Sequence, residues 1–336
     1  MLTDIFAYRY ANTPLFSEMT EPLRRLLVQG FRILNEQVQP YLVDGKASKV
    51  GETFWSTLNK QLAMELGLEN LSITHYPVAT QFQGATKTRM QRYSDNLICG
   101  NWMKQPVPAG FSVDQHIKER LSLIELGFRK KEQELAAFRK TMATAEAGNI
   151  LASLNFQNAS KLNDTKFEAN VDELNARFQQ AGVQLNYHNG FIQISQDALT
   201  QNEVETPFWA LVAPKKWANV DTDMKTAIDL RDSGGRDAVF YAARALESTI
   251  KIISDDKKWT HGGERGAANF IDNLASKQNG FIDQWEAKLL KLFFSDVRNP
   301  FGHGPGTSPM PALTAEQTQS AIELSMSQCK SLISRL

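Results

Sequence analysis

An arginine and a histidine near the end of a helical segment are the side chains of this sequence that are best placed for chemistry. Arg298 and His303 lie in the segment Asp296–Gly304, where Asn299 precedes a proline. A residue before proline is disfavoured in the α conformation, so we expect a helix to end here, with Arg298 near its C-terminus. Glycines flank His303 on both sides and leave its imidazole unshielded. The two side chains can therefore converge on one anion.

The chemistry that this pair suggests is cleavage of RNA. A histidine can take the proton from a ribose 2′-hydroxyl or give one to the leaving 5′-oxygen. An arginine can hold the phosphate and offset the charge that builds up in the transition state. Asn299, beside the arginine, can orient the histidine or the substrate. This chemistry needs neither a metal nor a cofactor, and no acidic or Cys/His cluster in the sequence indicates a metal site.

A plainer interpretation of the same residues is a helix C-terminus. An arginine in the last turn of a helix interacts favourably with the last carbonyl groups, and a Gly/Pro run is then simply a turn. The spacing of Arg298 and His303 alone favours this interpretation, whereas the sequence around them favours the ribonuclease.

The motif resembles that of the HEPN superfamily (higher eukaryotes and prokaryotes nucleotide-binding domain). Its ribonucleases carry an Arg-polar-x-x-x-His motif at the junction of two helices, which Arg298, Asn299 and His303 match. The segment Ala242–Lys251 looks like the early helix of this superfamily, which carries a glutamate that faces the motif. Glu247 occupies that helix here.

Two further pairs of segments make the resemblance more specific. Trp259–Gly262 and Asn299–Gly304 look like the C-terminal HEPN domain of AbiJ-type abortive infection proteins. Leu26–Arg32 and Phe54–Trp55 resemble one of the helical N-terminal domains attached to that domain. The resemblance spans nearly the whole chain and is absent over Lys140–Asp164.

The resemblance implies a toxin-like endoribonuclease that acts in anti-phage abortive infection. In this superfamily two protomers meet so that both motifs form one composite site, which implies a homodimer through the bundle. Arg298 would hold the phosphate, His303 would transfer protons and Asn299 would orient, leaving a 2′,3′-cyclic phosphate. A phage-derived trigger or an antitoxin is a possible partner. The alternative is a non-catalytic RNA- or nucleotide-binding or dimerisation module that partners another defence enzyme.

Three residues are candidates for supporting roles at this site. Glu247 can form a salt bridge with Arg244 or with Arg298, as a purely structural contact or as a support for the motif. His261 lies in a loop before a helix, where it can touch substrate or simply cap the loop.

The segment 85–104 carries a local positive charge. Four basic residues stand against Asp95, which leaves a net charge of 4 − 1 = +3, and Tyr93 lies among them. Basic and aromatic side chains together can bind single-stranded RNA, although a solvated helix face is the more common reason for such a segment. The candidate RNA-binding residues are Lys87, Arg89 and Arg92.

Helical periodicity covers most of the chain and must position these residues. Capping signals support it at Thr20, at Ser112 and at Thr314. One β signal stands out within 183–194, where apolar and polar residues alternate on both sides of Asn189-Gly190. Such a pattern predicts a β-hairpin with a tight turn. Because a lone hairpin is only marginally stable, we expect it to pack on the preceding helix. The predicted helices are 21–38, 49–66, 87–103, 113–147, 167–180, 221–231, 236–254, 265–276, 282–298 and a last one that runs from Thr314 almost to Leu336.

The sequence therefore predicts a mainly α-helical protein in three parts. Residues 1–149 form an N-terminal helical domain. Residues 150–214 form a linker, with 149–164 as its Asn- and Ser-rich stretch, and a small helix-plus-β-hairpin element. Residues 215–336 form a HEPN bundle of four or five helices.

Composition limits the possible partners and compartments. The chain has 336 residues with 37 Lys plus Arg and 37 Asp plus Glu, so a strongly basic coat for nucleic acid is excluded. Residues 215–336 hold 16 basic against 15 acidic residues, which favours a local RNA site over sequence-blind coating of phosphates. Cys99 and Cys329 make no disulfide framework. With no signal peptide and no apolar run of membrane-spanning length, we expect a soluble cytoplasmic protein with no membrane partner.

Overall fold

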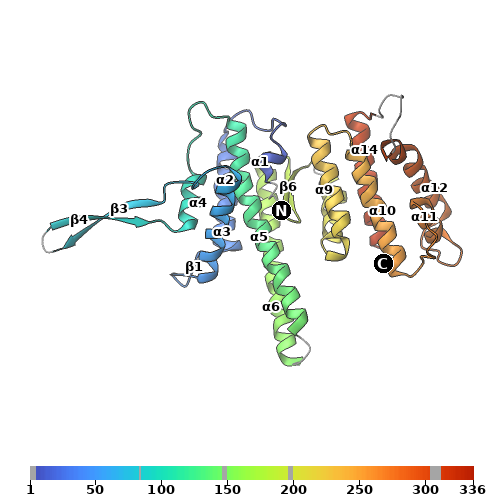
Figure 1. The fold of residues 1–336 in the computed structure, drawn as a ribbon, viewed down its shortest axis with the longest axis horizontal. Helices are drawn as coiled ribbons and strands as arrows, with labels where there is room; N and C mark the ends of the chain where they lie inside the picture. The colour runs from blue at the N-terminus through green and yellow to red at the C-terminus, as the bar shows by residue number, and fades with distance from the viewer. Residues whose placement is uncertain (1–4, 83–84, 146–149, 196–199, 303–311) are drawn as a thin grey trace. The chain divides into compact units, whose positions relative to one another are not determined.

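The computed structural model describes residues 5–82, 85–145, 150–195, 200–302 and 312–336. The chain forms two compact units, Met1–Gln193 and Ile194–Leu336. Helices dominate both, and the strands form only small two-stranded sheets (Figure 1). The predicted fold class, mainly α, is therefore confirmed. The boundary between the units falls inside the range 150–214 that the sequence analysis set apart.

The first unit is built around long helices that share one apolar core. Trp55, Leu58, Leu121 and Phe128 are fully buried there. Thr20 caps its helix as predicted, because its side chain accepts a hydrogen bond from the Leu23 N–H. The helical segments are α1 Phe6–Arg9, α2 Glu21–Arg32, a wide π-helical turn η1 Ile33–Val38, α3 Lys49–Glu65, α4 Asp95–Met103, α5 Val113–Ala145 and α6 Ile150–Gln180.

Three hairpins complete the first unit. β1 Leu42–Val43 pairs with β2 Lys46–Ala47, and β3 His75–Phe82 pairs with β4 Ala85–Arg92 in antiparallel register. β5 Leu185–His188 pairs with β6 Phe191–Ile194.

The β3–β4 hairpin corrects the helix that was predicted over 87–103. Residues 87–92 are strand, and the helix begins only at Asp95, after Ser94 in an extended conformation. The alternation of Thr86, Lys87, Thr88 and Arg89 is strand-like, and β-branched threonines favour extended backbone. The apolar spacing of Met90 and Leu97 suggested a helical period by coincidence.

The linker predicted over 149–164 is wrong from Ile150 onward, because this residue begins α6. Asn and Ser have low helix propensity, yet tertiary contacts override such local preferences. α6 packs on α5, where Arg139 pairs with Asp164 at 2.6 Å and the rings of Phe128 and Phe167 lie 6.0 Å apart.

The hairpin predicted around Asn189-Gly190 is confirmed. Both turn residues have positive φ, 42° and 88°, which is the conformation that an Asn-Gly turn favours. The hairpin packs on the preceding helix, as expected, through Asn175 of α6. Its side chain accepts a hydrogen bond from the Tyr187 N–H at 2.7 Å and donates one to the Tyr187 carbonyl at 3.1 Å.

The second unit is a helical assembly around α10. This helix packs against α9, α14, α11 and the turn η4, and Val239, Ala243, Leu246 and Ile250 are fully buried. The capping box at Thr314 and Gln317 is formed as predicted. The helical segments are η2 Gln201–Glu205, α8 Thr206–Val212, η3 Lys215–Trp217, α9 Ala218–Asp232, α10 Ala238–Asp256, α11 Ala267–Ala275, α12 Gln284–Leu292, η4 Phe293–Arg298, α13 Asn299–Gly302 and α14 Ala315–Ile333.

A buried glutamate in the second unit makes its stability depend on pH. Burial raises the pKa of Glu205 from its ordinary value of 4.5 to about 7, although Arg231 opposes this shift and Ser195 donates a hydrogen bond to the carboxyl. Between these two values the folded chain keeps a proton that the unfolded chain releases, so stability falls as the pH rises through this window.

We therefore expect Glu205→Gln to remove this slope. Above pH 7 the variant should be more stable than the wild type by about 1–3 kcal/mol, because it has no charge to bury. Urea unfolding followed by circular dichroism at pH 5 and pH 8 measures the difference. Glu203→Gln, an exposed neighbour, is the matched control and should leave the slope unchanged. A wild-type slope that persists in Glu205→Gln would contradict the assignment.

Two smaller findings concern the membrane and the cysteines. None of the helices within the described ranges combines the length and the apolar character that a membrane span requires. Cys99 lies in the core of the first unit and Cys329 in that of the second, both as free thiols. Burial raises the pKa of Cys329 to about 12.

Candidate functional site

Arg298 lies in a wide turn of helix rather than at a helix end. The turn η4 Phe293–Arg298 is π-helical and leads directly into α13 Asn299–Gly302, and Asn299 has φ −62° and ψ −38°. The expectation that Asn299 leaves the α region was therefore wrong. Pro300 stands in the first turn of α13, where the N–H that a proline lacks would have no partner within the helix. π-Helical turns such as η4 occur frequently at functional sites.

The Arg298 guanidinium is held from several sides. Its Nη2 lies 3.4 Å from Oε2 of Glu247, its Nη1 lies 3.4 Å from Oδ1 of Asn299, and its Cζ lies 5.3 Å from the ring centroid of Phe240. A Cβ atom at Gly302 would lie 3.1 Å from Arg298 Nη1, so the glycine leaves room for the guanidinium. The side chain of Arg298 is 24 % exposed, which leaves part of the guanidinium open to a ligand.

Two cations share the Glu247 carboxylate. Lys251, one turn further along α10, lies 2.7 Å from Oε1, while Arg298 approaches Oε2. One negative charge thus stands between two positive charges, which leaves a local excess of +1. Of the two partners expected for Glu247, Arg244 and Arg298, the structure shows Arg298 in contact with it.

Arg244 has a different partner. Its Nε and Nη2 donate to the Asp223 carboxylate at 2.9 and 2.5 Å, and its Cζ lies 4.4 Å from the ring of Tyr241. This ion pair joins α10 to α9 and raises the pKa of Arg244. The structure therefore pairs Arg244 with Asp223 and not with Glu247.

The loop of His261 is organised by Glu264. The Glu264 carboxylate accepts the His261 backbone N–H and an Asn273 side-chain N–H, both at 2.7 Å. These hydrogen bonds lower the pKa of Glu264 to about 2. The imidazole of His261 is exposed, so this residue caps the loop by its backbone and leaves its side chain free for a second role.

His303 lies outside the described residues, which end at Gly302 on this side. The arrangement of Arg298, Glu247 and Phe240 therefore defines the described part of the site. Gly302, which directly precedes His303 in the chain, lies close enough to Arg298 that a Cβ on it would crowd the guanidinium.

The basic residues predicted to bind RNA lie on a strand and not on a helix. Lys87 is paired in register with Thr80, and Arg89 with Val78. Arg89 is exposed, and no ion pair involves it within the described residues. Arg92, at the end of β4, donates to both oxygens of Asp95 at 3.3 and 3.1 Å. Only part of the predicted basic group is therefore free for an anion.

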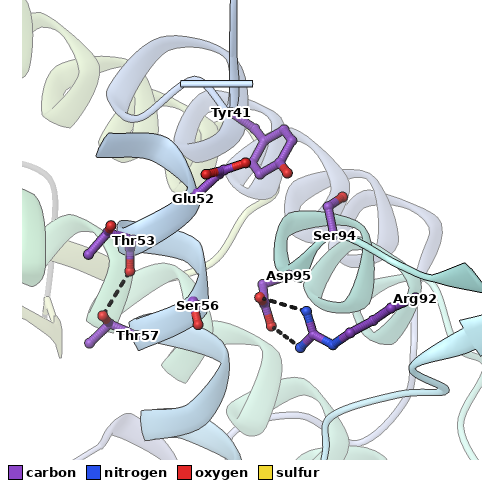
Figure 2. A pocket seen from close by; sticks show the side chains of 8 residues that line it. All are labelled: Tyr41, Glu52, Thr53, Ser56, Thr57, Arg92, Ser94 and Asp95. Atoms are coloured by element: carbon purple, nitrogen blue, oxygen red, sulfur yellow. Dashed lines mark hydrogen bonds and ion pairs between the residues drawn. The ribbon is translucent and has the colours of Figure 1, made fainter. Parts of the chain in front are cut away.

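A polar pocket in the first unit was not predicted from the sequence. It lies between α3 and the start of α4, at the base of the β3–β4 hairpin, with a volume of about 430 Å³ (Figure 2). The sequence signal that could have found it is the Ser/Thr-rich face of α3 beside the Arg92–Asp95 pair. Its lining residues are Tyr41, Glu52, Thr53, Ser56, Thr57, Arg92, Ser94 and Asp95.

The described residues contain no group of three or more His, Cys, Asp or Glu side chains arranged to hold a metal ion. The comparison with protein families matches residues 4–210 to the family described as AbiJ N-terminal domain 4. This match covers the first unit from residue 4 and ends at residue 210, so the Arg298 site lies outside it. Neither the curated proteins nor the solved structures include a match to this chain.

Proposed function

This chain belongs to the AbiJ N-terminal domain 4 family, and so to the abortive infection proteins, and we propose that it acts there as a metal-independent endoribonuclease. The observation that carries the proposal is the Arg298 guanidinium. It is held by Glu247 and Phe240, remains partly exposed, and has an excess of positive charge around it. This arrangement suits a phosphodiester, because an arginine fork binds phosphate oxygens and offsets charge in the transition state.

His303 supplies the proton transfer in this mechanism. One imidazole takes the proton of a ribose 2′-hydroxyl as the 2′-oxygen attacks phosphorus. A second imidazole gives a proton to the 5′-oxygen as its bond to phosphorus breaks. The two histidines come from two protomers that meet through the second unit, and the products are a 2′,3′-cyclic phosphate and a 5′-hydroxyl.

A second candidate function is a non-catalytic RNA-binding module. The β3–β4 hairpin favours it, since residues 70–94 contain three basic residues and no acidic one. Opposite charge would then hold RNA through Lys87 and Arg89 without any cleavage. A hairpin of this kind can also serve the ribonuclease as a contact for its substrate.

Incubation of the purified full-length chain with total RNA tests the proposal. We expect the wild type to leave 2′,3′-cyclic phosphate and 5′-hydroxyl ends, and His303→Ala to leave none and to lose its toxicity in cells, since proton transfer is lost. Cleavage should persist in excess EDTA. Mapping of the product ends identifies the chemistry.

The thermal unfolding of the His303→Ala variant should match that of the wild type, as the control for its fold. Wild-type cleavage by this variant would overturn the mechanism, and loss of cleavage in EDTA would overturn its metal independence. RNA binding by the wild type without any cleavage would favour the binding module.

A further inference from the structure

The polar pocket of the first unit contains several hydrogen-bond acceptors that have no proton left to donate. Three of its hydroxyl groups have already donated their single proton within the fold. Thr53 donates to the Lys49 carbonyl at 2.9 Å, Thr57 to the Thr53 carbonyl at 2.8 Å, and Ser94 to Asn96 Oδ1 at 2.6 Å. A hydroxyl whose proton is engaged presents only lone pairs. A molecule in this pocket therefore meets oxygen acceptors on several sides.

The ion pair in the pocket is internally balanced. Arg92 donates to both oxygens of Asp95, and Figure 2 shows the two side chains in direct contact in the pocket lining. Asp95 is buried and also accepts from Asn59 Nδ2 at 2.7 Å, which fixes its carboxylate in place. This pair contributes no net charge to the pocket.

The remaining charge comes from Glu52. Its carboxylate lines the pocket and is exposed, and no ion pair or hydrogen bond of its side chain occurs among the residues that the structure describes. A carboxylate is an acceptor only. The pocket thus carries a formal charge of −1. Its remaining donors are Tyr41, Ser56 and the three N–H groups of Arg92 that do not bind Asp95.

We propose that this pocket binds a small organic cation that carries N–H donors, such as a primary amine. An ammonium group matches the pocket in two respects, because it has three donors and no acceptor and its charge is opposite to that of Glu52. The pocket volume lies in the range typical of small-molecule sites. The inference concerns the first unit alone and does not rest on the ribonuclease activity.

Calorimetric titration of the full-length chain with putrescine tests the proposal. We expect saturable one-site binding that a putrescine analogue with both amines fully methylated does not reproduce, since this analogue keeps both positive charges without any N–H donor. Glu52→Gln should weaken putrescine binding about tenfold, because a charge-assisted hydrogen bond becomes a neutral one. Glu65→Gln, on the same helix but outside the pocket lining, is the matched control and should bind as the wild type does.

Three results would overturn the proposal. They are the absence of putrescine binding to the wild type, equal binding of the fully methylated analogue, and binding that Glu52→Gln leaves unchanged. Binding of adenosine monophosphate in preference to putrescine would also contradict it, since the pocket would then select an anion. Thermal unfolding of Glu52→Gln without ligand should match the wild type, because the exposed carboxylate has no partner to lose.

Discussion

An Arg298→Lys variant should cleave RNA about a hundredfold more slowly than the wild type, although it keeps the positive charge. Arginine presents a planar fork that can contact Glu247 on one edge and a phosphate on another, while lysine is a single point of charge. The Phe240 face that lies under the guanidinium also favours the planar group. Because the contact matters most as charge builds up in the transition state, kcat should fall more than KM rises.

Single-turnover cleavage of a defined RNA measures this effect, with Arg236→Lys as the control. Arg236 is an exposed arginine of the same unit that pairs with Asp237 and not with Glu247. It should tolerate the same substitution with unchanged rates. If Arg298→Lys cleaves at the wild-type rate, a point charge is sufficient and the fork has no role.

Glu125→Gln should destabilise the first unit by about 3–5 kcal/mol, since it removes a fully buried negative charge that pairs with both Arg9 and Arg129. The Glu125 carboxylate is fully buried and accepts from Arg9 at 3.0 and 2.6 Å and from Arg129 at 2.6 Å. It also accepts the Ile192 N–H at 2.7 Å. Both guanidinium groups also lie over the ring of Phe191, with Cζ of Arg9 4.7 Å and Cζ of Arg129 4.2 Å from its centroid. The network therefore joins α1, α5 and the β5–β6 hairpin.

Urea unfolding followed by circular dichroism measures the loss of stability, and amide hydrogen exchange locates it. We expect the amides of residues 185–194 to lose protection first, because Glu125 and Arg129 hold that hairpin directly. Glu173→Gln breaks an exposed pair with Arg177 within α6 and should cost less than about 1 kcal/mol. A cost for Glu125→Gln as small as that of Glu173→Gln would show that the network contributes little.

Local signals in the sequence predicted the elements whose cause is local. The caps at Thr20 and Thr314 and the turn at Asn189-Gly190 all form as expected. Each depends on hydrogen bonds or backbone conformations within about four residues, which the sequence shows directly.

Predictions failed where a distant segment or an unusual turn decides the outcome. Residues 150–164 look like a linker by composition but form a helix, because α5 offers α6 a surface to pack on. Asn299 stays helical before a proline, at the junction of the π-helical turn η4 with α13. Residues 85–92 form a strand because β3 pairs with them.

The same distinction between local and distant causes holds for the candidate site. The sequence by itself determined the mainly α fold class and singled out Arg298, Asn299 and His303 as a motif. Tertiary structure alone decided that Glu247 faces Arg298 and that Arg244 turns to Asp223. It also decided that Glu125 holds Arg9 and that a pocket forms beside the Arg92–Asp95 pair. The physical reason is the distance along the chain between the residues that interact. A cap or a turn is settled by neighbours in the chain, whereas a partner 51 or 116 residues away is chosen by how whole helices pack.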